Sequence, residues 1–228
     1  MNLLCGSFAV VAALMYNDLT LAFWLIVAGI VFDFFDGFVA RLLHSSSAIG
    51  VQLDSLADVI TSGLAPAAVL WQVCLQTEPC WLPEGWKLGY GVFVLAAFSA
   101  LRLAKFNIDE TQTVEFCGLP TPAGSLLCAS LGMLWQQGML ALSSDGVLLV
   151  AVLTSLLLVS PIRMFALKFH GFGWRGNEVR YLFLLASIVL IIILRTYAIP
   201  VIIVLHIVVS AVRWLCMRSG NPDKAPKA

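Results

Sequence analysis

Long apolar stretches, separated by short polar connections, cover most of the 228 residues. Most of these stretches are close to the roughly 20 residues that a helix needs to cross a bilayer. They are continuous rather than alternating at every second residue, which favours helices over strands. We predict an all-α, polytopic transmembrane bundle of about eight helices, each satisfying its own backbone hydrogen bonds. The predicted segments are 2–15, 20–41, 50–75, 88–107, 120–138, 146–167, 179–195 and 198–216.

The composition excludes an ordinary soluble domain. The chain is 61% hydrophobic and 11% charged, with a mean hydropathy of +0.96, whereas soluble domains carry about 25% charged residues. The formal net charge is zero, so binding to nucleic acid is not indicated. We predict one membrane domain over residues 1–218, followed by a polar, disordered tail over residues 219–228.

The lysines and arginines predict an orientation in the membrane. If the N-terminus is cytoplasmic and the segments alternate, all of the 13 basic residues except Lys87 and Arg195 fall on the cytoplasmic side. Cytoplasmic loops carry this excess in membrane proteins. We therefore predict a multi-pass protein of the cytoplasmic membrane with both termini in the cytoplasm. The turn between the second and third segments then faces the cytoplasm.

Four aspartates lie close to that turn. Asp33 and Asp36 are three residues apart, and Asp54 and Asp58 four apart, so each pair shares one face of its helix. The short turn "LHSSSAIG" makes the two helices antiparallel. Equal distances from the turn then place Asp33 opposite Asp58, and Asp36 opposite Asp54 one turn nearer the water. The four carboxylates are expected to converge on one small volume.

Such a cluster predicts bound cations. Four bare carboxylates cannot all stay charged in a low dielectric unless a cation lies among them. Ligands that offer only oxygen favour a hard ion, Mg²⁺ or Mn²⁺. Two divalent ions would balance the four charges, and carboxylate-bridged ion pairs are a recurrent device for displacement at phosphorus.

Small residues flank the aspartates. Gly37, Ala40 and Gly50 would let a helix or a flat ligand approach the backbone closely. Helix packing alone is the alternative explanation for them. Arg41 follows directly and could pair with an aspartate or with a phosphate.

These residues together fill the spacing D-x2-D-G-x2-A-R-x8-G-x3-D-x3-D. The pattern resembles the signature of the CDP-alcohol phosphatidyltransferases, which are integral membrane enzymes. The stretches "NLLCGSFAV", "QLDSLADVITSGLAPA", "ALRLAKFN", "GLPTPAG" and "SPIRMFALK" resemble the bacterial-type members that use serine as the alcohol. The resemblance implies transfer of a phosphatidyl group from CDP-diacylglycerol to L-serine, with CMP leaving. It also implies a homodimer in the lipid bilayer.

Roles for single residues follow from the resemblance. Asp33, Asp36 and Asp54 would hold the metal ions that grip the diphosphate, and Asp58 would complete that site and act as the general base. The residues expected to line the CDP-diacylglycerol site are Asn2, Gly37, Ala40, Arg41 and Gly50.

The acceptor site needs a cation for the serine carboxylate or a lipid phosphate. We nominate five polar residues on the predicted cytoplasmic side, with headgroup anchoring as their alternative role. They are Arg102, Lys105, Asn107, Arg163 and Lys168. Lys105 stands where relatives more usually have arginine, which keeps the charge but changes its geometry.

Other hypotheses stay open. The acceptor could be glycerol 3-phosphate or inositol. From a different class, the carboxylates could form an ion or proton relay in a transporter, because buried carboxylates also mark transport pathways. In a purely structural membrane protein, the aspartates would be dispensable. Cys74 and Cys80 could form a disulfide if their loop faces an oxidising compartment.

Overall fold

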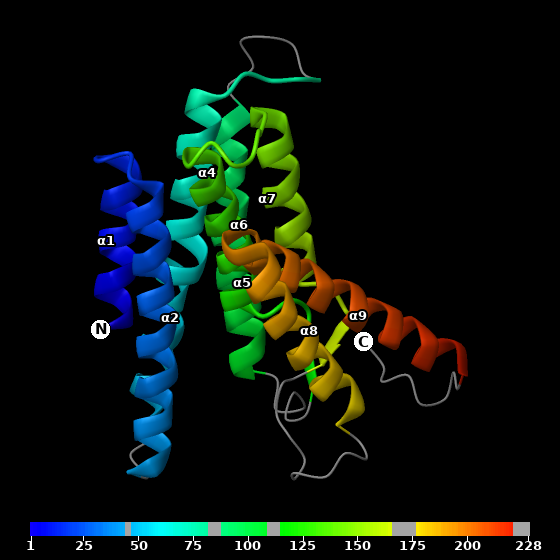
Figure 1. Ribbon diagram of the computed structural model, residues 1–228. Helices are drawn as coiled ribbons and strands as arrows, with labels where there is room; N and C mark the ends of the chain where they lie inside the picture. Colours follow the sequence, from blue (N-terminus) through cyan, green and yellow to red (C-terminus); the bar gives the residue numbers. More distant parts are fainter. Residues whose placement is uncertain (44–46, 82–87, 109–114, 166–176, 221–228) are drawn as a thin grey trace.

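The computed structural model describes the chain apart from residues 44–46, 82–87, 109–114, 166–176 and 221–228. Helices lie in every stretch that the apolar pattern predicts (Figure 1). The α-helices are α1 (Asn2–Leu14), α2 (Leu19–Leu42), α3 (Ala48–Asp58), α4 (Ala65–Gln76), α5 (Val94–Ile108), α6 (Thr121–Gln136), α7 (Ser144–Leu158), α8 (Glu178–Leu194) and α9 (Ala198–Gly220). The tighter or wider helical turns are η1 (Val59–Leu64), η2 (Leu88–Phe93) and η3 (Arg195–Tyr197).

Several of these helices are suited to a membrane. Four stretches are long and apolar enough to cross one, and α1 and α7 are shorter apolar helices. The four stretches are Leu19–Ala40, Ala48–Gln76, Gly89–Ile108 and Glu178–Cys216. The protein is thus an all-α membrane protein in class, while the number of crossings and the side of each terminus stay predictions.

Two features differ from the prediction. The helix expected over 146–167 ends at Leu158, and strand β2 (Arg163–Phe165) pairs antiparallel with strand β1 (Glu115–Cys117). Pro161 accounts for the break, because proline lacks an N–H and restricts the residue before it. Each strand has three residues, which is too short for a periodic pattern to reveal.

The first two helices form one side of the bundle (Figure 1). Ala9 and Ala13 of α1 are fully buried together with Phe23 and Ile26 of α2. Small residues on one helix and large ones on the other allow close packing without a hydrophobic force between helices in lipid. This packing holds the start of α1 beside the lower half of α2, where the first two aspartates lie.

The third predicted helix contains a π-helical turn. η1 continues α3 directly after Asp58, and the N–H of Ala65 reaches the carbonyl of Ile60, five residues back. Pro66 gives the physical reason, because it has no N–H to donate to the carbonyl of Ser62, four residues earlier. Such turns occur frequently at functional sites.

Glycines allow other helices to reach this turn. A Cβ built on Gly6 of α1 would lie 2.3 Å from Thr61 Oγ1 and 2.8 Å from Thr61 Cα. A Cβ on Gly63 would lie 3.0 Å from Ser99 Cβ of α5. Helices α1 and α5 therefore approach η1 almost backbone to backbone, on either side of the segment that follows Asp58.

The hairpin of α8 and α9 stands to one side of this bundle (Figure 1). α8 packs mainly against α9, and α9 contacts α6 and β2. His206 of α9 lies 3.2 Å from the backbone carbonyl of Phe165 through Nε2. This contact attaches the strand pair to α9.

Candidate active site

An asparagine joins two of the aspartates. The Asn2 side-chain nitrogen donates to Oδ1 of Asp33 at 3.1 Å and to Oδ1 of Asp58 at 2.9 Å. Asn2 is 4% exposed, and Thr61 Oγ1 donates to its backbone carbonyl at 3.1 Å. The first residue of α1 therefore brings together one carboxylate from α2 and one from α3.

The orientation of the Asn2 amide is fixed by its surroundings. Its Oδ1 is buried and has no hydrogen-bond partner among the residues that the structure describes. A Cβ on Gly29 of α2 would lie 3.2 Å from this oxygen, so the oxygen side of the amide faces the helix backbone. The nitrogen side consequently faces the carboxylates, which can only accept while ionised.

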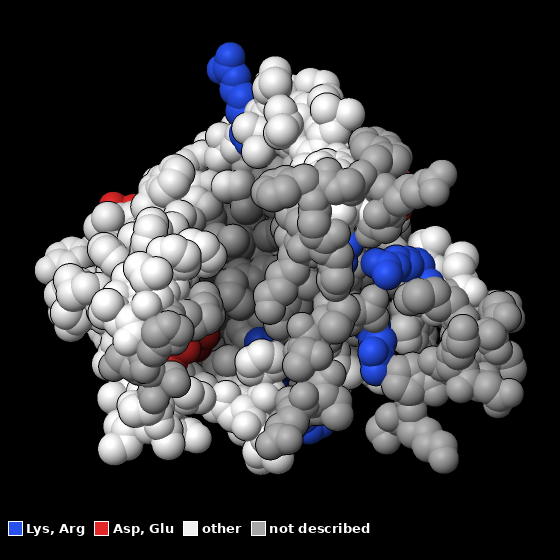
Figure 2. All heavy atoms as spheres, turned by 90° about the horizontal axis from the view of Figure 1, so that it is seen from below, with Lys and Arg blue, Asp and Glu red and all other residues white. Residues whose placement is uncertain are grey.

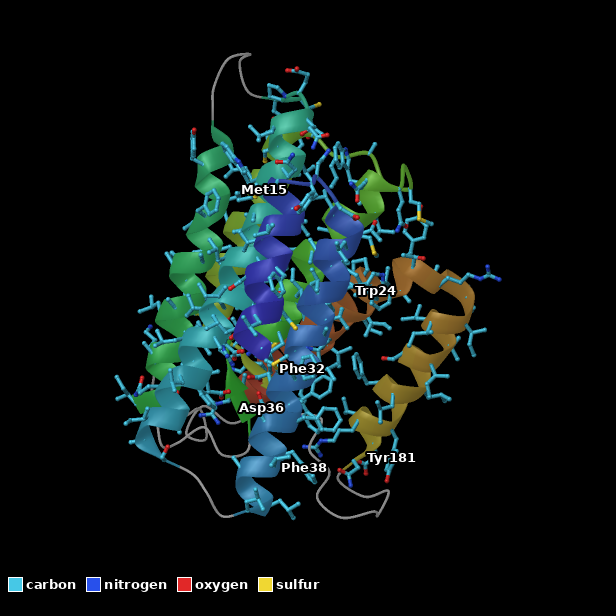
Figure 3. The ribbon with its side chains drawn as sticks, turned by 90° about the vertical axis from the view of Figure 1, so that its left-hand side faces the viewer. Met15, Trp24, Phe32, Asp36, Phe38 and Tyr181 are labelled. Carbon is cyan, nitrogen blue, oxygen red and sulfur yellow. The ribbon has the colours of Figure 1, made fainter. Side chains whose placement is uncertain are left out.

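The other two aspartates are more open to solvent. Asp54 is exposed, and its carboxyl interacts with those of Asp33 and Asp58. Asp36 is 61% exposed, and its Oδ2 lies 3.9 Å from the nitrogen of Met1. Figure 3 shows Asp36 on α2 between Phe32 and Phe38, beside the lower end of α1. Helices α2 and α3 thus deliver the carboxylates to one end of the bundle, and α1 adds the amide of Asn2.

The donor chemistry fits a hard divalent ion, although the ligand set is not closed. In the part of the chain that the structure describes, no three Asp, Glu, His or Cys side chains form a group that could hold a metal ion as they stand. The aspartates offer only oxygen ligands, which is what Mg²⁺ and Mn²⁺ prefer. Mutual interaction of Asp33, Asp54 and Asp58 also creates a concentration of negative charge that a cation would relieve.

The small flanking residues have mixed surroundings. Gly37 and Ala40 are half-buried on α2. Gly50 lies in the first turn of α3, where its N–H donates to the Ser47 side chain at 3.0 Å. Ser47 is therefore the N-cap of α3, a role that sequence reasoning missed although serine is a preferred cap. The side chain of Arg41 lies outside the described part.

Arg102 links the aspartates to a second region. It is 8% exposed, and its Nη1 donates to Thr121 Oγ1 at 2.6 Å. Its guanidinium carbon lies 5.6 Å from the centre of the Phe106 ring. The guanidinium also interacts electrostatically with Asp58 and with Cys117. Its Nε is buried, and no described residue forms a hydrogen bond with it.

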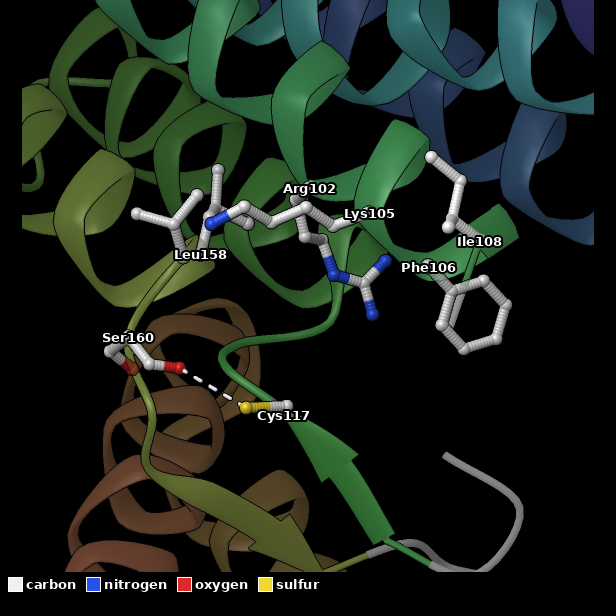
Figure 4. Close-up of a pocket in the computed structure, with 8 residues that line it drawn as sticks. Arg102, Lys105, Phe106, Ile108, Cys117, Leu158 and Ser160 are labelled. Atoms are coloured by element: carbon white, nitrogen blue, oxygen red, sulfur yellow. Dashed lines mark hydrogen bonds between the residues drawn. The ribbon is translucent and has the colours of Figure 1, made fainter. Parts of the chain in front are cut away.

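A pocket of about 310 Å³ opens beside Arg102 (Figure 4). The close-up shows the guanidinium pointing down toward the strand that carries Cys117. The lining residues come from α5, β1 and the end of α7. They are Arg102, Lys105, Phe106, Ile108, Cys117, Leu158, Val159 and Ser160.

Of the other residues predicted for the acceptor site, the two that the structure describes do not line this pocket. Asn107 Nδ2 donates to Ser55 Oγ on α3 at 2.8 Å, so it braces the acidic helix against α5. Arg163 lies on β2 opposite Cys117, and not at the end of a membrane helix as predicted. Lys168 lies outside the described residues.

Opposite charges lie around one recess of the molecule. Seen from below, this face is hollowed, with acidic side chains at one edge and basic side chains across the hollow (Figure 2). A recess with carboxylates on one side and cations on the other can hold a ligand with both a metal-binding group and an anionic group.

These features define a class: a helical membrane protein with a carboxylate site and a cationic pocket at one end of its bundle. Comparison with known sequences narrows the class. Residues 1–165 match the CDP-alcohol phosphatidyltransferase family. The chain therefore belongs to this family. Membership makes the protein a transferase of phospholipid biosynthesis, as the resemblance predicted, and leaves the transporter and purely structural hypotheses without support.

Three similar proteins carry the name CDP-diacylglycerol–serine O-phosphatidyltransferase. The relative from Bacillus subtilis is 33% identical over 173 residues, covering 75% of this chain and 88% of the relative. The one from Helicobacter pylori is 31% identical over 203 residues, covering 86% and 80%. The one from Mycobacterium tuberculosis is 32% identical over 240 residues, covering 98% and 81%.

Proposed function

We propose that the protein transfers the phosphatidyl group of CDP-diacylglycerol to the hydroxyl of L-serine, releasing CMP and forming phosphatidylserine. The observation that carries the proposal is the pair Asp33 and Asp58, which Asn2 joins, with Arg102 between this pair and a cationic pocket. The names of the relatives support serine as the acceptor.

Asp58 is the proposed general base. A serine hydroxyl is a weak nucleophile at neutral pH, so a positioned base assists it. Oδ1 of Asp58 already accepts from Asn2, and we therefore assign the hydroxyl proton to Oδ2. As the proton moves, the serine oxygen attacks the phosphorus next to diacylglycerol, and the bond from that phosphorus to CMP breaks.

The carboxylates are the proposed metal ligands. Two Mg²⁺ or Mn²⁺ ions, bound by Asp33, Asp36, Asp54 and Asp58, would supply charge stabilisation to the phosphoryl oxygens and to the departing CMP. Gly37, Ala40, Arg41 and Gly50 would line the cytidine and diphosphate region. Asn2, the remaining residue proposed for the CDP-diacylglycerol site, also orients two of the carboxylates.

The acceptor is proposed to bind at the pocket of Figure 4. Arg102 and Lys105 can pair with the serine carboxylate, and the guanidinium offers a fork of donors for this purpose. Serine and CMP are water-soluble, while the donor carries two acyl chains. An active site on the cytoplasmic face of the membrane, open to both phases, suits these substrates.

The decisive experiment is release of CMP from CDP-diacylglycerol by the purified protein. We expect release to require serine, to stop with a chelator, and to return with Mg²⁺ or Mn²⁺. Glycerol 3-phosphate and inositol serve as the competing acceptors. CMP release that depends on one of these alcohols and not on serine would refute the acceptor assignment.

Two variants distinguish loss of the proposed general base from loss of an aspartate carboxylate elsewhere in the protein. We expect Asp58→Asn to abolish transfer while the protein stays folded and binds metal more weakly. Asp18→Asn is the matched control, because Asp18 caps α2 at the other end of the bundle through the N–H of Leu21. Activity of Asp58→Asn near that of the parent would remove the base assignment.

The homodimer is also a proposal, which the family resemblance supports. Mass measurement of the protein in lipid nanodiscs tests it, and a single-chain mass at all protein concentrations would contradict it.

A further inference from the structure

Cys117 stands at the edge of the pocket beside Arg102. Its side chain is exposed, on strand β1 and outside the candidate membrane spans. Its Sγ lies 3.7 Å from the backbone carbonyl of Ser160 (Figure 4). Thiols donate only weakly, so this contact fixes the position of the sulfur without removing it from the pocket.

The charged side chains that the structure describes around this pocket are cations. Of the eight lining residues of the pocket, two are cations and none is acidic. Arg102 interacts electrostatically with Cys117. Arg102 also lines the pocket, which places its positive charge beside the sulfur. Cations beside an exposed sulfur raise the local concentration of an anionic reagent there.

We propose that Cys117 is a covalent modification site for small electrophiles that carry a carboxylate. Arg102 and Lys105 hold the carboxylate, which brings the electrophilic carbon to Sγ. With iodoacetate, a bond forms between Sγ and the methylene carbon, and the carbon–iodine bond breaks. Iodide leaves with the bonding electrons, and the thiol proton goes to solvent. The product places a second carboxylate inside the pocket.

Cys80 is an internal control in the same molecule. It is also exposed, but its backbone N–H donates to Oδ2 of Asp145 at 3.0 Å. A carboxylate so close disfavours an approaching anion. Cys128 is buried and should react with neither reagent.

The experiment compares iodoacetate with neutral iodoacetamide on the full chain in detergent micelles. Peptide mass spectrometry gives the alkylation rate at each cysteine. We expect the ratio of the iodoacetate rate to the iodoacetamide rate to be about five- to tenfold higher at Cys117 than at Cys80, falling as salt is added. Lys105→Gln should lower the ratio at Cys117 and leave that at Cys80 unchanged. Equal ratios at the two cysteines, or no alkylation of Cys117, would overturn the proposal.

The consequence for activity rests on the proposed function. The new carboxylate occupies the cationic pocket, so alkylation should remove serine-dependent CMP release, and serine should slow alkylation. Cys117→Ala protein should keep its own starting activity after the same treatment. Equal inactivation of Cys117→Ala would refute the claim that modification of Cys117 blocks the site. If iodoacetate still prefers Cys117 but serine gives no protection, the modification site stands and the acceptor assignment fails.

Discussion

Replacement of Asn2 by leucine tests how the carboxylates are held. Leucine has a similar volume but no hydrogen-bonding group, so Asn2→Leu removes both bonds to Asp33 and Asp58 and leaves little cavity. The bond from Thr61 to the backbone carbonyl of residue 2 is retained. We expect α1 to stay in place and the two carboxylates to separate.

The magnitude follows from the type of bond. A hydrogen bond to a charged group contributes about 1.5–3 kcal/mol, and two such bonds are lost. Water replaces part of this at half-buried carboxylates. We therefore expect a loss of about 2–4 kcal/mol of transition-state stabilisation, or about 30- to 900-fold in kcat/KM. The unfolding temperature should change much less, because separation of two like charges offsets the lost bonds.

Serine-dependent CMP release measures this effect. Asn17→Gly is the matched control, because Asn17 donates to Gln76 at the other end of the bundle, at 3.3 Å. Its φ is +51°, which glycine adopts without strain. The control should retain activity within about threefold of the parent. A folded Asn2→Leu protein with the same activity as this control would refute the role assigned to Asn2.

Three further predictions concern other contacts. Gly6→Ala should lower the free energy of unfolding by about 1–3 kcal/mol, because the new Cβ meets backbone atoms of Thr61, which cannot rotate away. Gly91→Ala, whose new Cβ has its three nearest contacts with the flexible Leu148 side chain, should change the stability less, and equal losses would contradict this reasoning. Asn107→Ala and Ser55→Ala should reduce activity by similar amounts, and the double variant should lose little more than either one. Additive losses would instead favour a role of Asn107 in the acceptor site. Asp145→Asn should lower the unfolding temperature at neutral pH. The difference between parent and variant should shrink as the pH falls below 3.8 and vanish near pH 2.

The sign of the last effect follows from the surroundings of Asp145. Burial acts to raise the pKa of its carboxyl. Hydrogen bonds from the Ser143 side chain and from the backbone N–H groups of Trp81, Cys80 and Gly146 outweigh burial and lower the pKa from 3.8 to about 2. A lowered pKa stabilises the fold above the unfolded value of 3.8, and this stability is lost as the pH falls through the folded value. A difference that instead grows on acidification would refute the assignment.

The helices were predictable because their signal is long and local. Apolar stretches of membrane length leave few alternatives in lipid, where backbone groups must bond within their own segment. The proximity of Asp33 and Asp58 could also be predicted from the sequence, since residues equally far from a short turn lie at the same depth in two antiparallel helices. In contrast, Cys74 and Cys80, both in the described part of the chain, form no disulfide there.

The rest depends on contacts between segments far apart in sequence. Nothing in "GLPTPAG" shows that Thr121 receives the guanidinium of Arg102, because that contact needs α5 and α6 to pack first. Cys117 and Ser160 lie together at the pocket because β1 pairs with β2, and these strands are too short to predict. Asn107 was nominated for its polarity and cytoplasmic placement, while its partner Ser55 could be found only in three dimensions. The missed local signals were Ser47, which caps α3, Pro161, which ends the helix predicted over 146–167, and Pro66, which indicates the π-helical turn.

That turn couples the packing of the bundle to the chemistry of the site. Asp58 is the last residue of α3, and the wider turn begins immediately after it. Gly6 and Gly63 bring α1 and α5 against the same turn, and α1 carries Asn2 while α5 carries Arg102. Asn2 and Arg102, which both interact favourably with the Asp58 carboxylate, therefore come from helices that dock on one π-helical segment. A change that moves either helix off this segment should reduce activity before it unfolds the protein, since the Asp58 carboxylate would lose the partner carried by that helix while most of the buried core stays intact.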